Sequence, residues 1–233
     1  MNRLTKNIPH VFTLGNLCLG VLAIQHILTE NNTVPVVHYF VLLAAFFDLL
    51  DGFLARLLKV SSPLGGQLDS LADLVTFGVL PMFIYAQYVE DTTLQYLLLL
   101  VPTCSAIRLA VFNLSDDQNG SFKGISTTAH GLFVAFLPLL FYRNDGHLFG
   151  FQINEYFVVG IAIFFSFLMV SKLRMVSLKF TNSNFSDNWE RYLLIFAVVA
   201  LVGWLKVAAL PWAMLIYILL SVFGRLKQMK GKN

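Results

Sequence analysis

The sequence predicts an all-α membrane protein, a bundle of about eight helices that cross the bilayer. Of its 233 residues, 57% are hydrophobic and only 12% are charged, and long apolar windows recur along the chain. Soluble domains carry about 25% charged residues, and a helix needs about 20 mostly apolar residues to cross about 30 Å of hydrocarbon. The net charge of +3 comes without a basic patch interleaved with aromatic residues, so we expect no nucleic-acid binding.

Eight apolar windows follow one another along the chain. Polar or turn-rich segments such as TENNT, KVSSPLGG, VEDTT and RNDGH separate them. The windows cover approximately residues 9–28, 35–58, 67–88, 93–114, 125–142, 153–171, 191–205 and 208–224. No internal repeat divides the chain, so residues 1–233 are expected to form a single membrane-embedded domain.

The distribution of basic residues predicts the orientation of these helices. With eight crossings and both termini in the cytoplasm, 14 of the 16 lysines and arginines fall on the cytoplasmic side. The two exceptions are Arg143 and Lys206. Because basic residues are enriched in cytoplasmic loops, this asymmetry favours both termini in the cytoplasm.

Carboxylates interrupt the second and third windows, at Asp48, Asp51, Asp69 and Asp73. A charged side chain near the bilayer centre costs about 3 kcal/mol on insertion scales, so such residues are expected to have a function. Helical spacing places the first pair on one face of its helix with the small residues Gly52 and Ala55, and the second pair on one face of the next helix. The short connection makes the two helices antiparallel neighbours. The four carboxylates are therefore expected to converge near the cytoplasmic face.

Converging carboxylates predict a metal site. Ionised carboxylates in a poorly hydrated volume repel one another unless they take up protons or bind a cation. An all-oxygen set favours Mg²⁺, Mn²⁺ or Ca²⁺, and four carboxylates are enough to hold two ions about 3.5–4 Å apart, as in phosphoryl transfer. Gly52 and Ala55 leave space for a pyrophosphate and a nucleotide, and Arg56 offers a guanidinium fork to phosphate oxygens. The alternative is the cation site of an ion-coupled transporter.

The same residues fill a family motif. The pattern D-x2-D-G-x2-A-R-x8-G-x3-D-x3-D is matched at every fixed position, by Asp48, Asp51, Gly52, Ala55, Arg56, Gly65, Asp69 and Asp73. On this motif the chain resembles the CDP-alcohol phosphotransferase family. The stretches FTLGNLCLG, LDSLADLVTFGVLP, RLAVFN and SFLMVSK resemble its membrane-embedded bacterial phosphatidylserine synthases. The resemblance spans residues 8 to about 175, the expected catalytic core, and two further helices follow over 191–224.

The resemblance implies a reaction and roles for the motif residues. The donor would be CDP-diacylglycerol, and the hydroxyl of L-serine would attack the phosphorus attached to diacylglycerol and release CMP. Carried over by position, Asp48, Asp51 and Asp69 are metal ligands, Asp69 is also catalytic, and Asp73 is both a ligand and the base. Gly52 and Ala55 lie near the cytidine, and Arg56 and Gly65 complete the motif. The resemblance also implies a homodimer among lipids of the inner cell membrane, with its site facing the cytoplasm.

Two departures from the synthase pattern concern the acceptor. GISTTAHG stands where a proline-containing G-[LM]-P-x-P stretch is common, and Val111 replaces the second basic residue of R-L-x-[RK]-F-N. Both regions are placed to contact the acceptor alcohol. The alternatives to serine are glycerol 3-phosphate, inositol phosphate and choline.

Four further polar residues are candidates for substrate contacts. Arg108 either binds the acceptor carboxylate or a phosphate, or snorkels to the interface. Lys123 meets either lipid head groups or substrate. Thr13 and Asn16 bond either the nucleotide or a neighbouring helix.

The histidines give no metal signal. His130 has no second ligand one turn away, so we expect it to pack against a neighbour. The other four show no ligand spacing and are not assigned to the site: His10, His26, His38 and His147.

Overall fold

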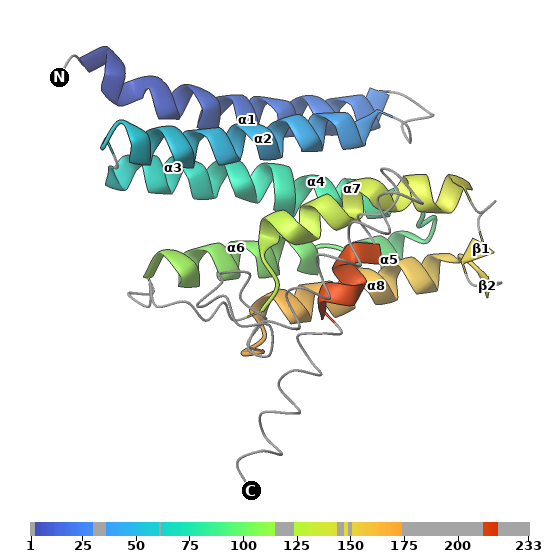
Figure 1. The fold of residues 1–233 in the computed structure, drawn as a ribbon. Helices are drawn as coiled ribbons and strands as arrows, with labels where there is room; N and C mark the ends of the chain where they lie inside the picture. Colours follow the sequence, from blue (N-terminus) through green and yellow to red (C-terminus); the bar gives the residue numbers. More distant parts are fainter. Residues whose placement is uncertain are drawn as a thin grey trace, which may run out of the picture.

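The fold is a bundle of roughly parallel and antiparallel helices, seen in a computed structural model (Figure 1). The structure describes residues 3–29, 36–60, 62–114, 124–143, 147–148, 151–173 and 212–218. The helices are α1 (Arg3–Thr29), α2 (Val37–Leu57), α3 (Pro63–Asp73), the π-helix η1 (Leu74–Val79), α4 (Leu80–Ala86), α5 (Thr92–Leu97), α6 (Leu100–Leu114), α7 (Thr127–Arg143) and α8 (Glu155–Val170). Within the described ranges the only strands are β1 (His147–Leu148) and β2 (Phe151–Gln152), a two-residue antiparallel pair.

Six of the eight predicted windows correspond to described helices. They are α1, α2, the continuous run α3–η1–α4, the run α5–α6, α7 and α8. The third begins at Pro63 and not at residue 67, because Ser62 caps it by accepting the backbone N–H of Gly65 at 3.0 Å and proline suits the first helical turn. The window at 191–205 lies outside the described residues. Of the window at 208–224, residues 212–218 are described and are helical.

Length and composition make this a helical membrane protein. The helical stretches Asn7–Thr29, Pro63–Ala86 and Thr92–Leu114 are long and apolar enough to cross a bilayer, and two shorter apolar helices cover Thr127–Leu139 and Glu155–Val170.

The outward faces of these helices fit a lipid environment. Large apolar side chains are exposed on α2 and α3, including Leu49, Phe53 and Leu71. An extended apolar surface of this kind would be unfavourable in water, whereas lipid tails solvate it.

The π-helix η1 lies at the centre of the bundle, directly after Asp73, and contacts α1, α6 and α7. Its Phe77 is fully buried. On α7, a Cβ at Gly131 would come within 2.7 Å of the Phe77 side chain, so only glycine allows the two helices this close approach. π-Helical turns often occur beside functional sites. Here the π-helix directly continues α3, the helix that carries Asp69 and Asp73, and its packing holds α3 in place.

Candidate active site

Three carboxylates meet where α2 faces α3. One oxygen from each of Asp48, Asp51 and Asp69 lies within 4.8 Å of the others. Asp51 is buried and the other two are half-buried. The end of α2, at Leu57, and the start of α3, at Pro63, lie side by side, as the sequence led us to expect (Figure 1).

The fourth carboxylate, Asp73, lies one turn deeper on α3, outside this group of three. Its side chain is 8% exposed, and its Oδ1 accepts a hydrogen bond from Asn16 Nδ2 at 3.2 Å. The Asn16 backbone carbonyl in turn accepts a hydrogen bond from Thr76 Oγ1 at 3.1 Å. Asp73 remains close enough to Asp48 and Asp69 for their charges to interact. The four acids therefore form one electrostatic cluster with three members at its mouth and one behind.

Helix α1 holds both acidic helices through the two polar residues that the sequence singled out on it. Thr13 is buried, and its Oγ1 donates a hydrogen bond to Asp51 Oδ2 at 2.5 Å, with the Pro9 carbonyl 3.2 Å away as a second acceptor. Asn16 bonds Asp73 on the other acidic helix. A bond from either residue to the nucleotide stays a prediction, whereas the alternative, bonding between helices, is present in the structure. Its effect is to orient two of the carboxylates.

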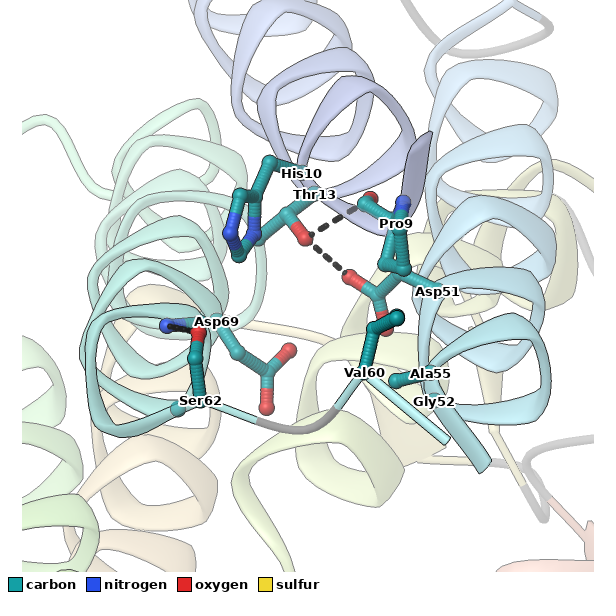
Figure 2. A pocket seen from close by; sticks show the side chains of 11 residues that line it. Pro9, His10, Thr13, Asp51, Gly52, Ala55, Val60, Ser62 and Asp69 are labelled. Carbon is teal, nitrogen blue, oxygen red and sulfur yellow. Dashed lines mark hydrogen bonds between the residues drawn. The ribbon is translucent and has the colours of Figure 1, made fainter. Parts of the chain in front are cut away.

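A cleft of about 230 Å³ opens from the acids between α1, α2 and α3 (Figure 2). Among the residues that line it are six predicted site residues: Thr13, Asp51, Gly52, Ala55, Gly65 and Asp69. A Cβ at Gly52 would meet nothing within 4 Å, so this glycine borders open space. A Cβ at Gly65 would lie 3.0 Å from His10 Cε1, so this glycine makes room for a ring.

The residues present fit a divalent cation. Asp48, Asp51 and Asp69 each offer a carboxylate oxygen as a ligand. Mg²⁺, Mn²⁺ and Ca²⁺ prefer such oxygen ligands. Asp69 Oδ1 is buried and has no hydrogen-bond partner among the described residues. A buried carboxylate oxygen without a partner is costly, and a bound cation removes that cost. Asp48, Asp51 and Asp69 are therefore the residues that would hold a metal.

The predicted cationic residues occupy different positions. Arg56 is exposed, and its Nε donates to the Gly52 carbonyl at 3.0 Å. Arg108 on α6 is half-buried, and its charge interacts with that of Asp73. Its Nη1 makes a long 3.5 Å hydrogen bond to Thr127 Oγ1, and its Nε is buried without a partner among the described residues. Lys123 lies outside the described residues.

The structure adds two residues to the site, and the sequence analysis missed one of them. His10, which had not been assigned to the site, lines the cleft, and Thr127 lies against Arg108. The signal for His10 was its helical spacing, since it lies three residues before Thr13 on the same face of α1. Thr127 belongs to GISTTAHG, the stretch that the sequence analysis associated with the acceptor without naming a single residue of it. His130 packs as predicted, with its Nε2 3.3 Å from the Tyr85 hydroxyl.

These features define a class: a membrane-embedded helical protein whose carboxylate-lined cleft suits a divalent metal and a phosphorylated ligand. The sequence model of the CDP-alcohol phosphatidyltransferase family matches residues 6–170, which include the four clustered aspartates and the residues that line the cleft. The chain therefore belongs to the CDP-alcohol phosphatidyltransferase family.

Several relatives share one name, CDP-diacylglycerol–serine O-phosphatidyltransferase. The protein of that name from Bacillus subtilis strain 168 is 32% identical over 74% of this chain and 91% of its own length. The one from Helicobacter pylori strain J99 is 29% identical over 92% of this chain and 89% of its own length. An archaeal one, from Methanocaldococcus jannaschii, is 28% identical over 94% of this chain and 92% of its own length.

Proposed function

We propose that this enzyme transfers the phosphatidyl group of CDP-diacylglycerol to the hydroxyl of L-serine and releases CMP. The observation that carries the proposal is the meeting of three carboxylates between membrane helices, two of which, Asp51 and Asp69, line a cleft together with Gly52 and Gly65. Relatives named for this reaction align with up to 94% of the chain, which supports the choice of donor and acceptor.

The donor nucleotide would occupy the cleft. Asp48, Asp51 and Asp69 would hold Mg²⁺ or Mn²⁺, two ions in our proposal. When bound, divalent metal supplies the positive charge that offsets the pyrophosphate and the charge that develops at the reacting phosphorus. The open space beside Gly52 supports this placement, because a nucleotide can approach the α2 backbone there. Ala55 and Gly65 line the same cleft, and Arg56 stands at its mouth.

Asp73 acts as the general base in this proposal. The serine hydroxyl loses its proton to Asp73 as its oxygen forms a bond to the phosphorus that carries diacylglycerol. The bond from that phosphorus to the bridging oxygen breaks, and CMP leaves with the bonding electrons. An alcohol is a poor nucleophile at neutral pH, so a positioned base is needed. The hydrogen bond from Asn16 occupies Asp73 Oδ1 and helps to orient the carboxylate. The other oxygen, Oδ2, is left to accept the proton.

Arg108 would bind the acceptor. Its buried Nε lacks a partner among the described residues, so Arg108 has free donor capacity, and its charge interacts with that of the proposed base. A guanidinium binds a carboxylate or a phosphate with paired donors. Arg108 therefore favours an anionic acceptor such as serine or glycerol 3-phosphate over choline.

We also propose that the cleft opens to the cytoplasm in the inner cell membrane, that the chain is one catalytic domain, and that two chains associate. Support for the first comes from the basic residues, most of which fall on the side of the acidic cluster.

The test is an acceptor panel with CDP-diacylglycerol as donor. Purified protein with Mg²⁺ or Mn²⁺ is given serine, glycerol 3-phosphate, inositol phosphate or choline, and CMP release is followed. We expect release with serine only. Release with another alcohol and none with serine would overturn the serine assignment, while no release with any of them would overturn the reaction.

Arg108→Gln sharpens the acceptor assignment. Loss of charge-assisted hydrogen bonds worth about 1.5–3 kcal/mol should raise the KM for serine about 10- to 100-fold. CMP affinity should stay unchanged. Lys172→Gln removes an exposed charge elsewhere and is the control. A normal serine KM in Arg108→Gln would remove Arg108 from the acceptor site.

A further inference from the structure

His10 occupies a distinct level of the cleft. Three helices build the cleft, and each contributes one polar residue at the level of the acids: Thr13 from α1, Asp51 from α2 and Asp69 from α3. One helical turn toward the mouth, about 5.4 Å away, each contributes another lining residue, and these are His10, Ala55 and Gly65. Two of the three have little or no side chain. His10 is therefore the polar one of these three, and the nearby Ser62 already accepts the backbone N–H of Gly65.

The ring of His10 lies over the first turn of α3. A Cβ on Gly65 would come within 3.0 Å of His10 Cε1 and 3.6 Å of Nδ1, so a larger residue at 65 would displace the ring. Figure 2 shows the ring beside Thr13 on α1, on the same side of the view as Asp69, with Asp51 on the other side of Thr13. The fit between the ring and a glycine holds His10 against the cleft wall.

The Nδ1 atom of this ring has unused hydrogen-bonding capacity. It is buried, and none of the described residues bonds it. Asp51 is near enough for its charge to interact with His10, yet its Oδ2 accepts its hydrogen bond from Thr13. A ring placed only to hold Asp51 would donate to that carboxylate. Unpaired ring nitrogens also occur at His26, His38 and His130, which are not among the residues that line the cleft. The position of His10 on the wall of an open cleft therefore indicates that its nitrogen can bond a partner that arrives from outside.

We propose that His10 binds the donor nucleotide, through a hydrogen bond from its ring to the cytidine half of CDP-diacylglycerol. The inference rests on the proposed function. With the pyrophosphate at the level of the acids, the nucleoside extends one turn outward, to the level of His10, Ala55 and Gly65. The small residues leave it room, and His10 supplies the polar contact. His10 is a substrate-binding residue that sets affinity for the donor and takes no part in proton transfer.

The experiment measures CMP binding to the full-length protein in detergent with Mg²⁺, by calorimetry, together with steady-state kinetics. Loss of one hydrogen bond should weaken CMP binding and raise the KM for CDP-diacylglycerol by about three- to tenfold in His10→Ala. The kcat and the KM for serine should stay at their wild-type values. Unchanged CMP affinity in His10→Ala would overturn the proposal.

Two more substitutions separate a hydrogen bond from packing. The amide of asparagine can occupy the place of Nδ1, so His10→Asn should keep most of the affinity. Phenylalanine keeps the ring without its nitrogens, so His10→Phe should bind CMP as weakly as His10→Ala. Wild-type affinity in His10→Phe would show that the ring acts by packing or stacking and would overturn the proposed hydrogen bond. Because these two variants keep the side-chain bulk, the comparison holds even where alanine unfolds the protein.

A histidine on the same helix provides the control. His26 packs against Phe40, with ring centroids 6.1 Å apart, far along α1 from the cleft. His26→Ala should leave CMP affinity unchanged, and an equal loss there would overturn the assignment to His10. CMP binding needs no acceptor, so a wrong choice of serine leaves this test intact. A wild-type protein that binds no CMP would overturn both the inference and the proposed function.

Discussion

The surroundings of buried polar groups differ between the acidic cleft and the aromatic interior, which is the packed region around Tyr85, His130 and Phe165. In the cleft, Asp69 Oδ1 and His10 Nδ1 lack partners among the described residues and border open volume. In the interior, His130 is fully buried among packed rings: its Nε2 lies 3.3 Å from the Tyr85 hydroxyl, and its ring lies 5.4 Å from that of Phe165. Its Nδ1 also lacks a partner among the described residues, so the difference between the two regions is the open volume beside the unpaired atoms of the cleft.

We infer from this difference that polar groups of the cleft contribute to ligand affinity, whereas those of the interior contribute to the stability of the fold. A polar atom left unpaired beside open space gains its hydrogen bond or cation only when a ligand arrives, so its cost to the free protein becomes binding energy. A polar atom enclosed by packed rings stabilises one arrangement of the helices. Substitutions at the cleft should therefore change binding or catalysis with little effect on stability, and substitutions in the interior should do the reverse.

The largest expected effect is that of Asp73→Asn. An amide cannot accept the serine proton, and general bases contribute about 10²- to 10⁴-fold to rate. We expect kcat to fall by that factor while CMP still binds, measured by CMP release and by calorimetry. Asp91→Asn makes the same chemical change at the exposed N-cap of α5, where either side chain accepts the backbone N–H of Thr93, and should have no effect. Full activity in Asp73→Asn would remove the base assignment.

Gly52→Leu should have the next largest effect. No described atom lies within 4 Å of a Cβ at this position, so the chain should fold while the new side chain fills the cleft. We expect CMP affinity to fall about 100-fold, or about 2.7 kcal/mol. Binding of Mn²⁺ to the carboxylates, followed by electron paramagnetic resonance, should persist.

A matched glycine tests whether the effect of Gly52→Leu comes from the cleft. Gly160 on α8 also has no described atom within 4 Å of a built Cβ, but it faces outward. Gly160→Leu should leave CMP affinity unchanged. If Gly52→Leu bound CMP normally, the nucleotide would have to lie elsewhere.

The smallest expected effect lies in the aromatic interior. Tyr85→Phe removes the hydroxyl that contacts His130. Hydrogen bonds between membrane helices average about 0.6 kcal/mol, so the melting temperature in detergent should fall slightly while CMP affinity and kcat stay the same. Tyr96→Phe, at an exposed tyrosine, is the control. A change in CMP affinity in Tyr85→Phe would show that the two regions are coupled.

Much of the site could be predicted because helical spacing and a short connection fix which faces meet. Asp48 and Asp51 lie on one face of α2, the turn back places Asp69 opposite them, and the three do meet. The start of α3 was predicted too far along the chain, since the cap by Ser62 and the helical proline after it were not weighed. Arg56 was expected to serve the phosphates, yet its spacing could not show that its Nε bonds the Gly52 carbonyl.

The sequence by itself determined a membrane helix bundle, an acidic cluster at one end and the family, because hydropathy and motif spacing are properties of the chain alone. Only the tertiary structure decided that α1 closes the site. Thr13 and Asn16 bond the acids of two other helices, and His10 enters the cleft where Gly65 leaves room. These contacts join residues up to 57 positions apart. Spacing within one helix cannot show which residues of another helix will face it, so such partners emerge only when the helices pack.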